Sequence, residues 1–149
     1  MATPTTYLLD TNILVLLLRG KAAGKGVAAN FGLSGNMSRG IISVVTVGEM
    51  NALVRKWNWG KAKVDALDKL LGQVVQVDID HPDILTTYGD LDFVSSGTGR
   101  KMGKNDLWIA ATAKVCGVPL LTTDADFDHL CPAEITRIRI DSQTGNAMP

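Results

Sequence analysis

Cysteine is scarce in this chain, and long apolar runs are missing from it. Two cysteines among 149 residues are too few for a disulfide framework, and Cys116 and Cys131 match no zinc or redox spacing, so we expect reduced thiols in apolar surroundings. The longest apolar run, residues 13–18, is far shorter than the roughly 20 residues that cross a bilayer. No basic leader with a cleavage site is recognisable. We therefore expect a cytoplasmic protein without a membrane segment.

Acidic residues are missing from two long stretches, although the net charge of the chain is zero. Residues 11–48 and 93–105 contain no Asp or Glu but several cations: Arg19, Lys21, Lys25 and Arg39 in the first stretch, and Arg100, Lys101 and Lys104 in the second. Zero net charge does not by itself indicate a nucleic-acid binder. Each basic stretch abuts a candidate acidic site, which favours a basic rim around an acidic centre, with ordinary solvated surface as the alternative.

The hydrophobicity pattern alternates between short buried strands and amphipathic helices. The hydrophobic content of 46% fits a single globular domain over residues 1–149. We predict strands at residues 7–10, 41–45, 73–79, 119–122 and 135–140, and helices at 12–18, 21–31, 46–57, 61–71, 82–94, 105–116 and 124–130. Residues 95–103 are expected to be a loop, and residues 1–5 and 141–149 loose termini. This alternation is typical of an α/β fold with a mostly parallel sheet of four to five strands covered on both faces.

Two helix starts carry residues that are typical of caps. We expect Asn12 to cap the first helix, and Thr46 and Glu49 have the spacing of a capping box before the helix at 46–57. Trp57 belongs to the apolar stripe of that helix, and a break around Trp59 leads into the next amphipathic helix. The two helices are expected to form a hairpin whose tryptophans either pack internally or offer apolar surface to a partner.

Four acidic residues lie where strands end or helices begin: Asp10, Glu49, Asp106 and Asp124. The carboxyl ends of parallel strands share one edge of the sheet, where ligands usually bind, so we expect these carboxylates to face one another. Taken singly, each acid has a structural explanation as a turn residue, a helix cap or a member of the capping box.

Together, the four carboxylates would have a large electrostatic cost. Two carboxylates about 4 Å apart repel by about 4 kcal/mol at an effective dielectric constant of about 20, whereas a domain is stable by only roughly 5–15 kcal/mol. The cluster must therefore take up protons, lie beside cations or bind a metal. Oxygen ligands without supporting histidine or cysteine favour Mg²⁺ or Mn²⁺.

Four segments, in order along the chain, resemble the PIN-domain family: YLLDTNIL at residues 7–14, Ser43-x-x-Thr46-x-x-Glu49, KNDLWIAATA at residues 104–113 and LLTTDADF at residues 120–127. Within that family the chain is similar to the VapC-type toxins of type II toxin–antitoxin pairs. The resemblance implies a three-layer α/β/α sandwich. It also implies a Mg²⁺- or Mn²⁺-dependent endoribonuclease that cleaves single-stranded or structured RNA to 5′-phosphate and 3′-hydroxyl ends.

The resemblance also implies site residues and partners. Asp10 and Asp106 would hold the principal ion, with Glu49 and Asp124 completing its shell directly or through water, while a role for Asp126 stays open. Asn12 and Thr123 would be supporting polar residues, and Arg100, Lys101 and Lys104 are candidates to contact RNA phosphates. A cognate antitoxin and a homodimer are the expected protein partners.

Three other functions stay open. His81 and His129 could do acid–base work in a metal-independent ribonuclease, although we interpret both as structural. Asp10 could be the nucleophile of a metal-dependent phosphatase, but Asn12 occupies the position where phosphatases of the haloacid-dehalogenase kind have a second acid. The third is a non-catalytic PIN scaffold that acts as a binding module.

Overall fold

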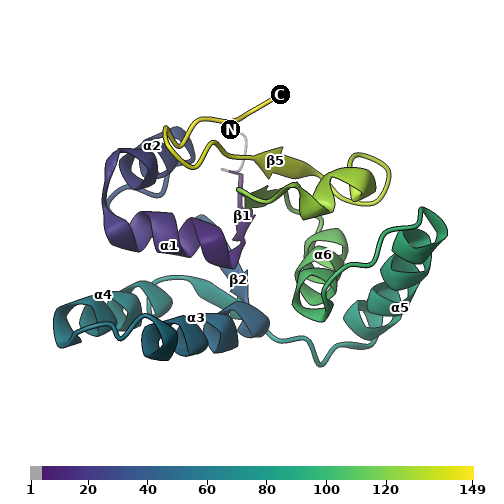
Figure 1. The fold of residues 1–149 in the computed structure, drawn as a ribbon, viewed down its shortest axis with the longest axis horizontal. Helices are drawn as coiled ribbons and strands as arrows, with labels where there is room; N and C mark the ends of the chain where they lie inside the picture. The colour runs from purple at the N-terminus through teal and green to yellow at the C-terminus, as the bar shows by residue number, and fades with distance from the viewer. Residues whose placement is uncertain (1–4) are drawn as a thin grey trace.

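Strands and helices alternate along the chain in the computed structural model, which describes residues 5–149 (Figure 1). The elements are, in order, β1 (Tyr7–Leu9), α1 (Thr11–Arg19), α2 (Ala22–Asn30), β2 (Gly40–Ser43), α3 (Val44–Lys56), α4 (Lys61–Leu71), β3 (Val75–Val77), α5 (Pro82–Gly97), α6 (Lys104–Cys116), β4 (Leu120–Thr122), the 3₁₀ helix η1 (Ala125–Leu130) and β5 (Arg137–Arg139). The predicted loose lead at residues 1–5 lies outside the described residues except for Thr5, whose carbonyl accepts a 3.0 Å hydrogen bond from Arg39 Nε.

The five strands form one sheet in the order β3-β2-β1-β4-β5, and every neighbouring pair is parallel. The predicted α/β class with a parallel sheet is therefore confirmed. The central strand β1 pairs with β2 on one side and with β4 on the other, so the chain order reverses beside it. In sheets of this kind a ligand site lies at that reversal, outside the carboxyl ends of the strands.

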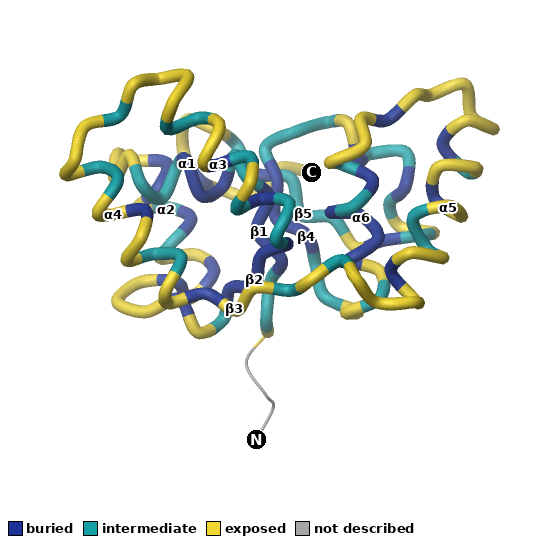
Figure 2. Tube along the Cα trace, turned by 90° about the horizontal axis from the view of Figure 1, so that it is seen from below, coloured by how far each residue is buried: buried dark blue, intermediate teal, exposed yellow. Residues whose placement is uncertain are grey.

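Helices cover both faces of the sheet and make three layers (Figure 1). Leu8 and Leu120 pack into the core under α5, α6 and η1, whereas their neighbours Leu9 and Leu121 pack into the core under α1 to α4. Successive residues of a strand point to opposite faces, so strands with two covered faces are apolar at every position. The buried residues accordingly gather along the strands in the middle of the molecule (Figure 2).

Two helices begin earlier than their predicted caps. Asp10, and not Asn12, is the N-cap of α1, and its carboxylate accepts from the Thr11 backbone N–H. Ser43 caps α3 by accepting a 3.1 Å hydrogen bond from Val45 N, so the strand ends at Ser43 and the predicted capping box of Thr46 is wrong. In both cases a side-chain oxygen at the end of the strand accepts from one of the free N–H groups of the helix start.

Helix α5 extends to Gly97, beyond the predicted end at residue 94. Ser95, which we assigned to a loop, is fully buried, and its hydroxyl lies 2.8 Å from His129 Nε2. The apolar pattern could not show this, because a buried serine is held by a hydrogen bond to a distant residue.

The C-terminal segment is not a loose tail. Asp141 accepts hydrogen bonds from the backbone N–H groups of Gln143 and Thr144, which closes a turn. A bridge between Ile140 and Ala147 and a hydrogen bond of 3.2 Å from Asn30 Nδ2 to the Gly145 carbonyl attach the segment to β5 and α2. The prediction of a loose tail therefore fails for residues 141–147.

Both cysteines are free, as predicted, but Cys116 is exposed at the end of α6 and does not lie in apolar surroundings. Across residues 5–149, every helix is too short or too polar to cross a membrane.

Candidate metal site

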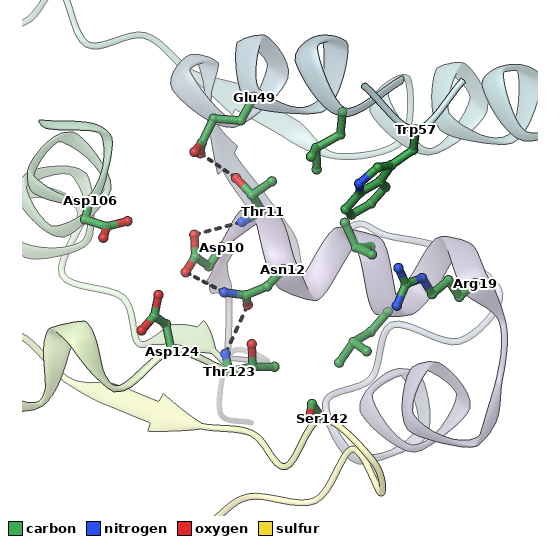
Figure 3. A pocket seen from close by; sticks show the side chains of 13 residues that line it. Asp10, Thr11, Asn12, Arg19, Glu49, Trp57, Asp106, Thr123, Asp124 and Ser142 are labelled. Carbon is green, nitrogen blue, oxygen red and sulfur yellow. Dashed lines mark hydrogen bonds between the residues drawn. The ribbon is translucent and has the colours of Figure 1, made fainter. Parts of the chain in front are cut away.

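Four different elements bring the four predicted acids to one cavity of about 380 Å³ (Figure 3). Asp10 follows β1 and Asp124 follows β4, the two strands at which the order of the sheet reverses. Glu49 reaches the cavity from α3, and Asp106 from the first turn of α6. The predicted supporting residues Asn12 and Thr123 line the same cavity. The carboxyl edge of the sheet thus gathers acids that are up to 114 positions apart in the sequence.

Asp10 is held in place by three hydrogen-bond donors. Its Oδ1 accepts from Thr11 N at 2.8 Å, and its Oδ2 accepts from Thr122 Oγ1 at 2.7 Å and from Asn12 Nδ2 at 3.1 Å. Asp10 is only 4% exposed, and this burial raises its pKa to about 6 against the opposing effect of the bonds from Thr122 and Thr11. The structure therefore fixes the position of a carboxylate that is costly to ionise without a cation.

Thr122 is a site residue that the sequence did not reveal to us. Its buried hydroxyl donates to Asp10 and accepts a 3.0 Å hydrogen bond from the Asp124 backbone N–H. Asn12 joins the same unit, because its side-chain carbonyl accepts from Thr123 N at 3.0 Å. The sequence Thr122-Thr123-Asp124 could have indicated this role, because a hydroxyl group at the end of a buried strand needs a hydrogen-bond partner.

Glu49 is oriented by α1, not by a cap of its own helix. Thr11 Oγ1 donates a hydrogen bond of 2.6 Å to Glu49 Oε1, and Thr46 Oγ1 lies 3.3 Å from the same hydroxyl. The buried Thr46 therefore supports the site from behind, where we expected a capping role for it. This contact joins α1 to α3 at the cavity.

Asp106 experiences repulsion from all the other acids. Burial, followed by the charges of Asp10, Asp124, Asp126 and Glu49, raises the pKa of Asp106 to about 7. Two of the acids, Asp10 and Asp106, thus hold protons in the metal-free protein at a pH where ordinary aspartates are ionised. A bound cation would replace those protons.

The carboxylates fit a hard divalent cation. Asp106, Asp124 and Asp126 each offer one oxygen, and these oxygens lie within 4.8 Å of one another. Oxygens that share one octahedral Mg²⁺ at about 2.1 Å lie about 3.0 Å apart when they are adjacent and about 4.2 Å apart when they are opposite, so the group must contract by up to about 2 Å to bind one ion. Among residues 5–149, the group of oxygens within 4.8 Å contains Asp126 and does not contain Asp10. From the sequence we had expected Asp10 and Asp106 to hold the ion together. Donors that are all carboxylate oxygens suit Mg²⁺ or Mn²⁺.

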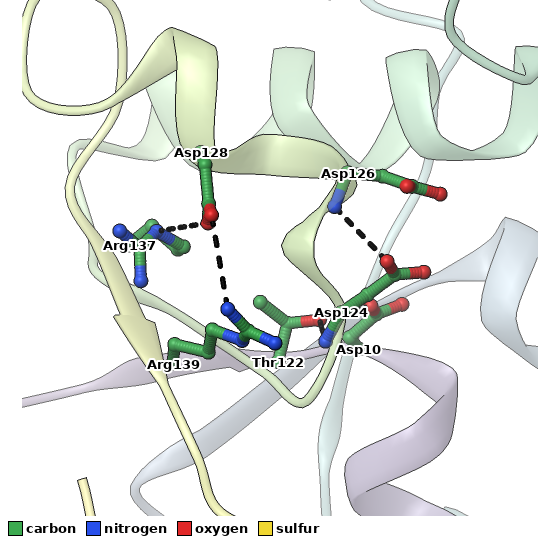
Figure 4. A network of polar contacts seen from close by, with 7 residues as sticks. All are labelled: Asp10, Thr122, Asp124, Asp126, Asp128, Arg137 and Arg139. Carbon is green, nitrogen blue, oxygen red and sulfur yellow. Dashed lines mark hydrogen bonds and ion pairs between the residues drawn. The ribbon is translucent and has the colours of Figure 1, made fainter. Parts of the chain in front are cut away.

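A neighbouring aspartate has a different environment (Figure 4). Asp128 on η1 pairs with Arg137 Nε at 3.2 Å and with Arg139 Nη1 at 3.8 Å, both from β5. Asp126, two residues earlier, is exposed, and its backbone N–H donates to Asp124 Oδ1 at 3.0 Å. The two arginines therefore neutralise Asp128 and fix η1 on the sheet, while the carboxylate of Asp126 stays available.

The predicted basic residues lie around the acids. Arg100 and Lys101 line a separate pocket of about 230 Å³ that they share with Asp126 and His129. Lys104 lines a further pocket beside Glu49 and Asp106. Cations of the second basic stretch thus border the acidic group in two places, whereas Arg39 of the first stretch instead donates to the Thr5 carbonyl just before β1.

The two histidines lie apart from the acidic cavity and from each other. His81 is exposed and caps α5 by accepting at Nδ1 from Asp83 N at 3.1 Å. His129 lies against Ser95, and burial together with the charge of Arg100 lowers its pKa. The cavities in the described part of the chain place no histidine beside the four acids.

Three known structures resemble this fold. The VapBC2 complex of Rickettsia felis, crystallised with a DNA fragment from its promoter, is 22% identical with a TM-score of 0.76, over 92% of this chain and 100% of that one. VapBC-5 of Mycobacterium tuberculosis, from the VapBC family of toxin–antitoxin systems, is 24% identical with a TM-score of 0.68, over the same shares of the two chains. VapC20 of Mycobacterium tuberculosis, described as a toxin that cleaves the sarcin–ricin loop, is 19% identical with a TM-score of 0.61, over 88% of this chain and 99% of that one.

Identities this low establish the fold that the chains share. No curated protein sequence matches the chain. The family model of the PIN domain matches residues 7–131, which include all the acids of the candidate site. By this match and by its fold, the chain belongs to the PIN domain family.

Proposed function

We propose that the protein is a metal-dependent endoribonuclease. The observation that carries the proposal is the group of carboxylates at the carboxyl edge of the sheet, with one oxygen each from Asp106, Asp124 and Asp126 within 4.8 Å. Asp10 and Glu49 face the same cavity from two further elements. Membership of the PIN domain family supports a nuclease, and the likeness to a toxin described as cleaving the sarcin–ricin loop supports RNA as its substrate.

Asp106 and Asp124 are the central ligands in this proposal. They belong both to the cavity with Asp10 and Glu49 and to the compact group with Asp126. Mg²⁺ or Mn²⁺ held there would supply an activated water and would offset charge on the leaving oxygen of a phosphodiester. Asp10 contributes a fixed negative charge beside the ion, and Asn12 and Thr123 keep that carboxylate oriented.

The cations at the border hold the RNA chain. Arg100 and Lys101 are exposed next to Asp126, and Lys104 is exposed next to Asp106. Phosphates of a single strand that crosses the site would meet these side chains on either side of the acids. We propose no specific contact with a base from this group, because all three residues are flexible cations on or beside a loop.

The test is cleavage of RNA by purified protein, free of any inhibitor. Single-stranded RNA should be cut in Mg²⁺ or Mn²⁺ to 5′-phosphate and 3′-hydroxyl ends, and a chelator should stop the reaction. Asp106→Asn and Asp124→Asn should be inactive, whereas Asp92→Asn, an exposed position on α5, should behave as the parent. Loss of activity in Asp126→Asn would show that the Asp126 carboxylate is a metal ligand, and full activity would show that it is not.

Other outcomes would identify the alternatives. Cleavage that survives chelation would contradict the metal site and favour the histidines. Turnover of a simple phosphate monoester with RNA left intact would indicate a phosphatase, against which the amide of Asn12 already counts because it donates to Asp10. A protein that cuts nothing but binds its partners would be a binding module.

We also propose that the protein is the toxin of a type II toxin–antitoxin pair and acts on RNA in the cytoplasm. The support is the likeness of fold to toxin–antitoxin complexes. A small protein encoded next to this one should bind it and inhibit its nuclease activity. Light scattering with and without that partner tests the expected homodimer.

A further inference from the structure

The cavity that contains the acids has a second end with different chemistry. Away from Asp106 and Asp124, it is lined by aliphatic residues of α1 and α3 together with Arg19 and Trp57 (Figure 3). Among the described residues that line the cavity, Arg19 is the one cation. The cavity thus joins an acidic end to an aromatic and basic end within about 380 Å³, a volume typical of small-ligand sites.

Trp57 is not used as a core residue. It follows the last turn of α3 and is 42% exposed, whereas Met50 on the same helix is completely buried. The sequence placed both residues on one apolar stripe. The indole ring instead borders the cavity, at the end away from Asp106 and Asp124 (Figure 3).

One cation lies over the ring of Trp57, and another lies over the ring of the neighbouring Trp59. The guanidinium carbon of Arg19 lies 5.5 Å from the centroid of the Trp57 ring. Trp59 lies 6.0 Å from Trp57 between ring centroids, and Lys63 Nζ lies 4.6 Å from the Trp59 ring. Within residues 5–149 Arg19 forms no ion pair, so its donors are available to an anion.

We propose that a nucleobase of single-stranded RNA stacks on Trp57 and that Arg19 binds the phosphate of the same nucleotide; this proposal rests on the nuclease function proposed above. Aromatic rings flanked by cations are the platform on which proteins bind single strands. A base that stacks on this face of Trp57 takes the place of the Arg19 guanidinium, whose central carbon lies 5.5 Å from the ring centroid. The exposed Arg19 side chain must therefore move off the ring, where it can bind the phosphate of the stacked nucleotide.

This placement gives the cavity a function in choosing where the chain is cut. A base fixed at one end sets which phosphodiester lies over the acids at the other. Stacking accepts every base, so Trp57 would set the register of the strand more than its sequence. An apolar peptide would leave the guanidinium of Arg19 without an anion, which is why we favour a nucleotide with its phosphate.

The test is binding of oligoadenylate and of an abasic phosphoribose chain of equal length, measured by fluorescence anisotropy in a chelator so that nothing is cut. Trp57→Leu should weaken binding of oligoadenylate roughly tenfold, within the range for loss of one stacked base, and leave the abasic chain unchanged. Trp57→Phe should restore most of the affinity. Phe93→Leu is the matched control, because Phe93 is an aromatic residue that is 82% exposed on α5 and does not line the cavity. Circular dichroism checks that each variant is folded.

Arg19→Gln should weaken both chains and lower the salt dependence of binding by about 0.7, the value for one phosphate on a single strand. The proposal is overturned if Trp57→Leu binds oligoadenylate as the parent does, if it weakens both chains equally, or if the parent binds neither chain. Unchanged RNA binding with loss of binding to a protein partner would overturn it too, since the surface would then belong to that partner.

The two proposals can fail separately. A parent that cuts RNA in Mg²⁺ while Trp57→Leu binds RNA normally contradicts the stacking alone. A parent that binds oligoadenylate through Trp57 but cuts no RNA contradicts the nuclease alone.

Discussion

Asp106→Asn is expected to stabilise the metal-free protein while it abolishes nuclease activity. Burial, followed by repulsion from the neighbouring acids, raises the pKa of Asp106 from an ordinary 3.8 to about 7, so ionising it at pH 8 costs free energy of folding. Each tenfold change in the acid constant corresponds to about 1.36 kcal/mol, which sets an upper bound of about 4 kcal/mol. Because the carboxylate is half-buried and partly screened by solvent, we expect about 1–2 kcal/mol, or roughly 3–6 °C in melting temperature.

The difference in stability between Asp106→Asn and the parent should grow as the pH rises. Between pH 3.8 and about 7 the folded parent keeps a proton on Asp106 that the unfolded chain has lost. The parent therefore loses stability as the pH rises through that window, whereas the amide of the variant does not titrate. The advantage of Asp106→Asn should be near zero at pH 4 and complete by pH 8.

Urea denaturation in a chelator at several pH values measures this difference, with Asp92→Asn as the control for removing a surface charge. An excess of Mg²⁺ should reverse the order of stabilities, since about 100 times the dissociation constant adds about 2.7 kcal/mol to the parent only. A variant that is no more stable than the parent at pH 8, or whose advantage is largest in acid, would refute the cost of ionising Asp106 that we infer from burial and repulsion.

Three further predictions concern pH, the amide at the site and helix packing. Nuclease activity should fall as the pH drops through about 7 to 6, because protons on Asp106 and Asp10 compete with the cation, and more Mg²⁺ should move the midpoint of the rate profile to lower pH. Asn12→Ala should lower the free energy of unfolding by about 1–2 kcal/mol, measured by urea denaturation, and should lower the cleavage rate at least tenfold, because Asp10 loses one of its hydrogen-bond donors. A cleavage rate equal to the parent's would exclude a positioning role for Asn12. Gly24→Ala should destabilise the protein by about 1–3 kcal/mol, because the added Cβ would lie 2.1 Å from a carbonyl oxygen of α1. Gly89→Ala lies in open space on α5 and should stabilise the protein by about 0.5–1 kcal/mol. Equal melting temperatures for the two variants would contradict this packing.

The sheet and its acids could be predicted because they follow from short-range patterns. Apolar runs such as those around Leu8 and Leu120 mark strands with two covered faces, and the parallel arrangement then places whatever follows each strand at one edge. Asp10 and Asp124 needed no further information to be placed together. Glu49 and Asp106 followed from their positions at helix starts.

The contacts between distant side chains could not be predicted in this way. The hydroxyl of Thr122 meets Asp10 across 112 positions, and that of Thr11 meets Glu49 across 38. A single sequence shows that a threonine is present but not which acid it contacts. The C-terminal turn is different, because the run from Asp141 to Gly145 carried an ordinary turn signal that we did not use.

The Thr122 hydroxyl makes the strand tips behave as a rigid body. One oxygen fixes the Asp10 carboxylate and the peptide of Asp124 relative to each other, so a displacement of β4 moves both acids together and preserves their separation. Asp106 is outside this body, since it accepts no hydrogen bond from the described residues and moves with α6. The distance from Asp106 to the strand tips is therefore set by how the buried residues of α6 pack against the sheet, and not by a hydrogen bond at the site.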